Sequence, residues 1–123
     1  MARSSDQLVV VRERCGAHCI AREDAEKLFN VIVPPLRAGH HVDLDFSGIE
    51  TLASSFLNVA IGRLYGTLEP VLVDQHLRWH GLDDADQSLM LLVIRNAKDH
   101  YRKTASQRAR EEEILRNLKE PEQ

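Results

Sequence analysis

The hydrophobic pattern of this chain switches repeatedly between the two-residue repeat of a strand and the three- and four-residue repeat of a helix. Three strand-like segments alternate with three helical ones, which predicts a small α/β sheet with crossover helices. The strand-like segments are Gln7–Arg14, His41–Phe46 and His76–His80. The helical segments are Arg22–Leu36, a stretch from Ser54 or Ser55 to near Gly66, and a long one from Asp83 or Asp84 to Pro121.

Residues that start or stop helices set the expected ends of these elements. Pro34 and Pro35 are predicted to end the first helix, because proline cannot continue the hydrogen-bond ladder. A serine is predicted to cap the second helix and an aspartate the third. The stretch 18–20 is interpreted as a short hairpin arm beside the first strand, and 71–73 fits either a strand or a buried helical turn.

The central strand places apolar and acidic side chains on opposite faces, since successive side chains of a strand alternate. Asp43 and Asp45 share the face opposite Val42 and Leu44. Paired carboxylates suit acid–base chemistry or a divalent cation, but an Asp at the end of a strand more commonly shapes the following turn. The second interpretation is favoured. The predicted core comprises Val42, Leu44, Phe46, Phe56, Ile61, Trp79, Leu92 and Val93.

Charge and cysteine content limit the classes of function. The net charge of −3 is too acidic for a general nucleic-acid binder. Cys15 and Cys19 are expected to be reduced, partly buried thiols on either side of a turn. Zinc held by these two and His18, with His40 and His41 further along the chain, is the less favoured alternative, because the spacing is loose. No catalytic or phosphate-binding glycine motif is present. We therefore expect no enzyme, no metal and no cofactor.

The two ends of the sequence carry a localisation and a boundary prediction. The longest near-apolar run, 89–94, is far shorter than the ~20 residues of a membrane span, and no secretory signal is visible, so a cytoplasmic protein is expected. Residues 1–101 are predicted to form the domain and 102–123 a charged helical extension, with six Lys or Arg and four Glu over 102–120. Ile114, Leu115 and Leu118 would let that extension pair with a partner helix.

The stretch Val42–Ile49, followed by Thr51–Asn58, resembles the STAS superfamily, which contains the anti-sigma factor antagonists. It is most similar to a bacterial STAS-like family of unknown function, which shows an Asp-Phe-x-Gly strand end and then a Ser-Phe that opens a helix. Ala21–Ala25 is similar to that family's Ser-Arg-x-x-Ala, and Leu77–Ala97 to its closing strand and helix. The resemblance covers roughly residues 7–101.

This resemblance implies a small mixed sheet packed by helices and a regulatory binding role without catalysis. In the antagonists, a histidine-kinase-like anti-sigma factor phosphorylates a serine at the helix start, and Ser54 matches that position, with Ser55 beside it. The chain departs from the antagonists at Ala53, where they have Asp, and at Phe56, where they have Gly. The implied partner-binding residues are Asp45, Ser47, Gly48, Ser54, Ser55, Phe56 and Asn58.

Three functions are therefore compared. The leading hypothesis is a protein–protein interaction module in bacterial signalling, whose partner is a histidine-kinase-like ATPase or an anti-sigma factor and which can also form a homodimer through its C-terminal helix. The second is a small metal-dependent enzyme built on Asp43 and Asp45. The third is a nucleic-acid-associated regulator whose basic residues are Arg102, Lys103, Arg108 and Arg110.

Overall fold

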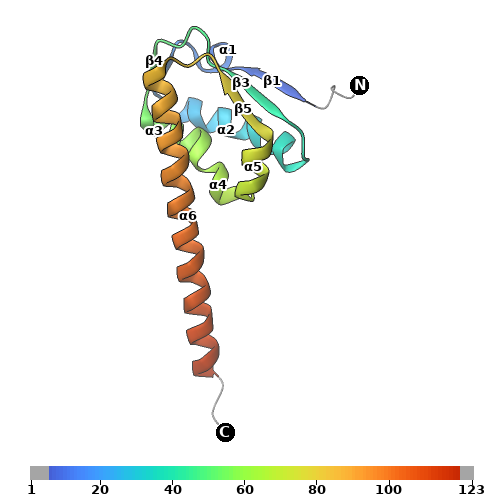
Figure 1. Ribbon diagram of the computed structural model, residues 1–123, viewed down its shortest axis with the longest axis vertical. Helices are drawn as coiled ribbons and strands as arrows, with labels where there is room; N and C mark the ends of the chain where they lie inside the picture. The colour runs from blue at the N-terminus through green and yellow to red at the C-terminus, as the bar shows by residue number, and fades with distance from the viewer. Residues whose placement is uncertain (1–5, 120–123) are drawn as a thin grey trace.

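The computed structural model describes residues 6–119, with side chains over residues 6–103. Strands and helices alternate along the chain (Figure 1). The strands are β1 (Gln7–Val10), β2 (His18–Cys19), β3 (Val42–Asp45), β4 (Thr51–Leu52) and β5 (Leu77–His80). The helices are α1 (Val11–Cys15), α2 (Arg22–Arg37), α3 (Ser54–Leu57), the π-helix η2 (Asn58–Gly62), α4 (Leu64–Thr67), α5 (Pro70–His76) and α6 (Asp84–Lys119).

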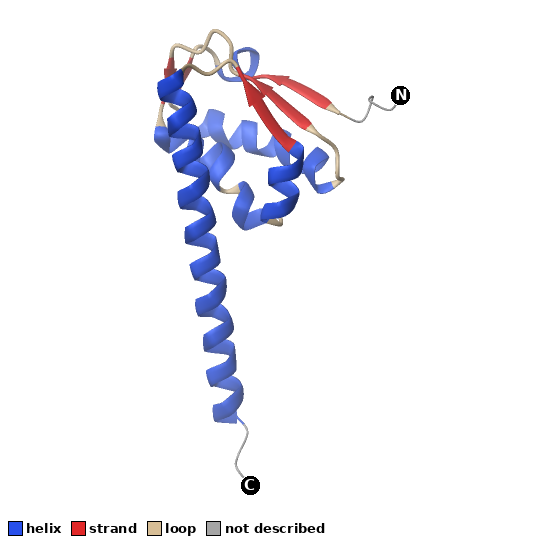
Figure 2. Cartoon of the chain, in the orientation of Figure 1, coloured by secondary structure: helices blue, strands red, loops and turns tan. Residues whose placement is uncertain are grey.

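The main sheet has three strands in the order β1-β3-β5, and a separate pair joins β2 to β4. Figure 2 shows α2, α4 and α5 on one side of the three strands. The predicted α/β class is confirmed, but every strand pairing among the described residues is parallel rather than mixed. The reason is that helices connect β1 to β3 and β3 to β5, and such crossovers return the chain in the same direction.

The core lies between the helix-covered face of this sheet and the helices. The predicted core residues Val42, Leu44, Phe46, Phe56, Ile61 and Val93 are all buried. Trp79 is only half-buried, and its indole N–H donates to Gln87 Oε1 at 2.9 Å. Leu92 was predicted wrongly: it is 49% exposed, since α6 turns Met90, Val93, Ile94 and Ala97 inward instead.

The first predicted strand is shorter than expected. β1 ends at Val10, and Val11–Cys15 forms the helix α1, which buries Val11 and Cys15 at helical spacing. The predicted hairpin arm at 18–20 is also wrong. β2 pairs instead with the distant β4, as His18 lies opposite Thr51 and Cys19 opposite Leu52. Two-residue strands carry no periodicity from which such a partner could be inferred.

The first helix ends within one residue of its predicted boundary, although Pro34 and Pro35 do not themselves terminate it. Both prolines lie inside α2, which continues to Arg37. Their rings remove two N–H donors, but their carbonyl groups still accept hydrogen bonds from the N–H groups of Ala38, at 3.1 Å, and His40, at 2.9 Å. The fully buried Leu36 gives the last turn a hydrophobic anchor. The helix therefore ends close to the prolines, two residues after Pro35.

The helical stretch after β4 contains an irregular turn. The expected serine cap is not formed: Ala53 is the N-cap residue, Ser54 is the first helical residue, and no side chain caps this end. The helix then widens into η2, in which the N–H of Arg63 donates to the carbonyl of Asn58, five residues earlier, at 3.1 Å. A short α4 ends this stretch at Thr67, beyond the Gly66 that was predicted to close it.

The remaining elements follow local signals. Residues 71–73, compatible with strand or helix, lie in α5. Asp83 caps α6, because its Oδ1 accepts a hydrogen bond from the N–H of Asp86 at 2.8 Å. α6 packs against α3, η2 and α4, and its C-terminal half extends away from the rest of the chain (Figure 1). None of the described helices combines the length and the apolar character needed to cross a membrane.

Candidate functional site

The chain leaves the sheet at the carboxyl end of β3 through a tightly bonded turn. The backbone N–H of Ser47 donates to Asp45 Oδ1 at 2.9 Å, and the hydroxyl of Ser47 also donates to this carboxylate. These bonds, followed by the positive charge that His80 carries when protonated, hold the pKa of Asp45 below its ordinary value. Asp45 therefore has the turn-shaping position expected of it.

His80, at the end of β5, lies between the two carboxylates of β3. Its Nδ1 is 3.1 Å from Asp43 Oδ1, and its Nε2 is 3.4 Å from Asp45 Oδ1. The register makes this possible, because Asp45 and His80 are directly paired on the same face of the sheet. A protonated imidazole donates to both carboxylates at once, whereas a neutral one can donate to only one.

The turn after β3 is held by two close neighbours. Gly81, with φ of +90°, lies against the Phe46–Ser47 peptide: a Cβ at residue 81 would be 2.7 Å from the backbone nitrogen of Ser47. Gly48, with φ of +78°, lies under the side chain of Arg12, which a Cβ would approach to 3.0 Å. Only glycine fits both the conformation and the space at residue 81. The turn therefore packs against Gly81 on one side, and the exposed side chain of Arg12 covers Gly48 on the other.

The segment that follows is attached to residues 17–19. The N–H groups of Glu50 and Thr51 both donate to the carbonyl of Ala17, at 2.8 and 3.2 Å. The N–H of Ala53 donates to the carbonyl of Cys19 at 3.0 Å. These three bonds continue the β2–β4 pairing and determine where α3 begins. Loop backbone held in this way presents its side chains on a rigid scaffold.

The predicted partner-binding residues are mostly brought together on this surface. Ser47, Gly48, Ser54, Ser55 and Asn58 are exposed, and Asp45 is half-buried behind Ser47. Phe56 is the exception: its side chain is 1% exposed and belongs to the core. Phe56 therefore cannot contact a partner from this surface. Because Phe56 is on the buried face of α3, Ser54 and Ser55 lie on its exposed face.

The other candidate metal ligands are spread over the fold. Cys15 and Cys19 are buried free thiols, whereas His18 is exposed, with its Nδ1 2.9 Å from Thr51 Oγ1. His40 and His41 directly precede β3, at the end of the strand opposite to Asp45. Within residues 6–103, no group of three or more His, Cys, Asp or Glu side chains is arranged to hold a metal ion.

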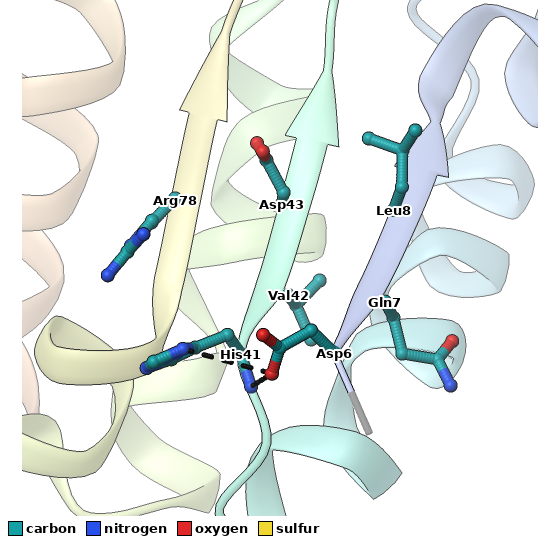
Figure 3. Close-up of a pocket in the computed structure, with 7 residues that line it drawn as sticks. All are labelled: Asp6, Gln7, Leu8, His41, Val42, Asp43 and Arg78. Atoms are coloured by element: carbon teal, nitrogen blue, oxygen red, sulfur yellow. Dashed lines mark hydrogen bonds and ion pairs between the residues drawn. The ribbon is translucent and has the colours of Figure 1, made fainter. Parts of the chain in front are cut away.

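The opposite, amino-terminal end of the strands carries a shallow pocket of about 310 Å³. Figure 3 shows His41 reaching toward Asp6, whose carboxylate accepts a hydrogen bond from the backbone N–H of His41 at 3.3 Å. Leu8, Asp43 and Arg78 form one row across the sheet above it. Asp43 is therefore shared between the two ends, and it links the pocket to His80.

The basic residues of the third hypothesis lie on α6, apart from the predicted partner-binding residues. Arg102 and Lys103 are exposed on α6, and Arg102 forms an ion pair with Asp99 one turn earlier. The side chains of Arg108 and Arg110 lie outside the described residues, as do those of Ile114, Leu115 and Leu118. The backbone of all five lies in α6.

Sequence reasoning missed three residues of the site, namely Arg12, His80 and Gly81. His80 was assigned to a strand, but its two carboxylate contacts depend on the β3–β5 register, which no local pattern reveals. The His-Gly pair at the end of a predicted strand is the one signal that could have identified His80 and Gly81, since parallel strands bring their carboxyl ends to one edge.

Comparison with known proteins identifies a family for this chain. A family model described as a STAS-like domain of unknown function (DUF4325) matches residues 24–87, from α2 into the first turn of α6. This match includes β3, the turn after it, α3 and His80. No curated protein and no solved structure matches the chain significantly.

Proposed function

Because the chain belongs to the family of STAS-like domains of unknown function, we propose that it is a non-enzymatic regulatory module that binds a protein partner in bacterial signalling. The module is cytoplasmic. Its contact surface consists of Asp45, Ser47, Gly48, Ser54, Ser55 and Asn58. The partner is a histidine-kinase-like ATPase or an anti-sigma factor, in line with the resemblance to the anti-sigma factor antagonists.

One observation carries this proposal: Ser54 is exposed at the start of α3, and its hydroxyl does not cap the helix. The fold therefore leaves this hydroxyl free to face a partner, while the backbone beneath it is held by the bonds of Ala53 and Thr51 to residues 17–19. An exposed polar group on a fixed backbone is what recognition requires, because little conformational entropy is lost on binding.

The two departures from the antagonist pattern have different consequences. The large side chain of Phe56 lies in the core, so it does not obstruct a partner that approaches the serines. Ala53 removes the acidic side chain that precedes the serine in the antagonists. A phosphate on Ser54 would add a charge of about −1.5 to −2, which is enough to release a partner without unfolding the domain.

The test places a photo-crosslinking amino acid at residue 54 in the native cell. Ser88 is the matched control, because it is also an exposed serine but lies on α6. We expect residue 54 to crosslink to a histidine-kinase-like ATPase or an anti-sigma factor, and residue 88 not to crosslink to it. Equal crosslinking from both positions, or an adduct with nucleic acid at residue 54, would refute the proposal.

The same pair of positions tests the role of charge. Ser54→Asp is expected to weaken binding of the crosslinked partner by about tenfold or more, which is 1.4 kcal/mol, and to leave the melting temperature unchanged. Ser88→Asp is expected to leave both unchanged. If Ser54→Asp binds as the unmodified chain does, Ser54 is not a regulated position.

A further inference from the structure

Two buried thiols lie at the ends of the segment 15–19, to which the start of α3 is anchored. Cys15 ends α1 and is 8% exposed, and Cys19 ends β2 and is fully buried. The sulfur of Cys15 is 3.7 Å from the carbonyl oxygen of Asp24, and that of Cys19 is 3.8 Å from the carbonyl oxygen of Gly16. The two side chains are also hydrogen-bonded to each other.

The surroundings make the two thiols unequal. The hydrogen bond from Cys19 lowers the pKa of Cys15, and Lys27 and Arg14 act in the same direction against burial and Asp24. The same hydrogen bond, with burial, raises the pKa of Cys19. Cys15 is therefore the thiol that ionises first, and Cys19 keeps its proton. This division into a nucleophile and a resolving thiol is typical of oxidisable pairs.

We propose that Cys15 and Cys19 form a redox modification site, which a hydroperoxide converts to an intramolecular disulfide. The proposal rests on the hydrogen bond between the two side chains, the four-residue separation of the cysteines in sequence and the residual exposure of Cys15, which Cys19 lacks. It goes beyond the proposed binding function and does not depend on it.

The reaction balances with hydrogen peroxide as the oxidant. The thiolate of Cys15 attacks one peroxide oxygen, the O–O bond breaks, and the departing hydroxide takes a proton to become water. The sulfenic acid formed on Cys15 is then attacked by the sulfur of Cys19, the S–O bond breaks, and the hydroxide leaves as water with the proton from Cys19. Two thiols are oxidised to one disulfide, and both peroxide oxygens are reduced to water.

Oxidation has a direct route to the contact surface. The disulfide would close the five-residue segment 15–19. The carbonyl groups of Ala17 and Cys19 belong to this segment. They accept the hydrogen bonds from the N–H groups of Glu50, Thr51 and Ala53. A disulfide demands a fixed separation and dihedral angle of its two residues. Any shift of these carbonyl groups on closure weakens the three bonds that they accept, and we expect the start of α3 to loosen in this way.

The first measurement is made on the unmodified chain, treated with hydrogen peroxide after full reduction. The expected product has no alkylatable thiol and a mass lower by about 2 Da, from the two hydrogens lost. In Cys19→Ser, dimedone is expected to trap sulfenic acid at Cys15, whereas Cys15→Ser is expected to give no adduct at Cys19. Thiols that stay reduced, or disulfides that form only between molecules, would overturn the modification site.

The second measurement follows amide hydrogen exchange in the reduced and oxidised protein. Exchange at Glu50, Thr51 and Ala53 is expected to be about tenfold faster after oxidation, through local opening. The N–H of Phe46, bonded to the carbonyl of His80 within the sheet edge, is the internal control and is expected to be unchanged. Unchanged exchange at all four amides in fully oxidised protein would refute the coupling. Partner binding is not part of either readout, so a failed binding proposal leaves both results interpretable.

Discussion

Replacing Gly81 by Ala tests whether the turn after β3 is fixed by contact with its neighbour. At residue 81 the backbone has φ of +90°, and an added Cβ would lie 2.7 Å from the nitrogen and 2.9 Å from the Oγ of Ser47. Both neighbours are tied down, since Ser47 is bonded to Asp45, and the preceding residue Phe46 is bonded through its N–H to the carbonyl of His80. The methyl group can be accommodated only if the turn moves.

Gly39 is a matched control, because it has a similar φ of +86° and nothing within 4 Å of an added Cβ. Gly39→Ala therefore loses only the conformational preference, about 1–2 kcal/mol. Gly81→Ala has the same loss and in addition displaces the Phe46–Ser47 peptide. The loss of one or two hydrogen bonds adds about 1–3 kcal/mol, so the total is about 2–5 kcal/mol.

Urea unfolding of both variants and the unmodified chain, followed by circular dichroism, gives these free energies. The expected result is that Gly81→Ala is less stable than Gly39→Ala by at least about 1 kcal/mol, the smallest loss expected from the broken hydrogen bonds. If the two variants agree to within about 0.5 kcal/mol, near the error of such comparisons, then residue 81 does not constrain the turn and the account of the site is wrong.

Three further predictions concern the core, the turn and the tail. Phe46→Ala, at a buried position, should lower the free energy of unfolding by about 3–5 kcal/mol, whereas Leu92→Ala, at a position 49% exposed, should lower it by less than about 1 kcal/mol in the same urea assay. The pKa of Asp45 is lowered in the folded protein by its bonds to Ser47. The stability from these bonds is therefore present above the unfolded pKa and is lost as the pH falls through the folded pKa. Below about pH 4, the urea midpoint of Asp45→Asn should depend less on pH than that of the unmodified chain. Truncation after Lys103 should leave a domain that unfolds cooperatively on heating, and an insoluble or molten product would show instead that the tail packs on the domain or on a second copy.

The elements with a clear repeat could be predicted from sequence. Val42, Leu44 and Phe46 alternate with polar residues, and all three are buried as expected. Asp83 was one of two expected caps and forms the cap of α6. In these cases the signal is local, because each residue's role depends on neighbours within a few positions along the chain.

Other features depend on contacts between distant residues, which local patterns do not contain. The β2–β4 pairing joins Cys19 to Leu52 across 33 positions of sequence. His80 meets Asp43 only because β5 adopts one register beside β3. The acidic and serine residues of the site could thus be predicted from the sequence. The residues packed against them, Arg12, His80 and Gly81, could not.

The length of α6 also determines how the molecule moves in solution. Its 36 residues span about 54 Å at 1.5 Å per residue, whereas a compact chain of 123 residues has a radius of gyration of about 14 Å. The body and its projecting helix will therefore diffuse like an elongated particle, rotating faster about the axis of α6 than about a perpendicular axis. In nuclear magnetic resonance relaxation, N–H bonds of α6 lie along that axis and will relax differently from those of the strands.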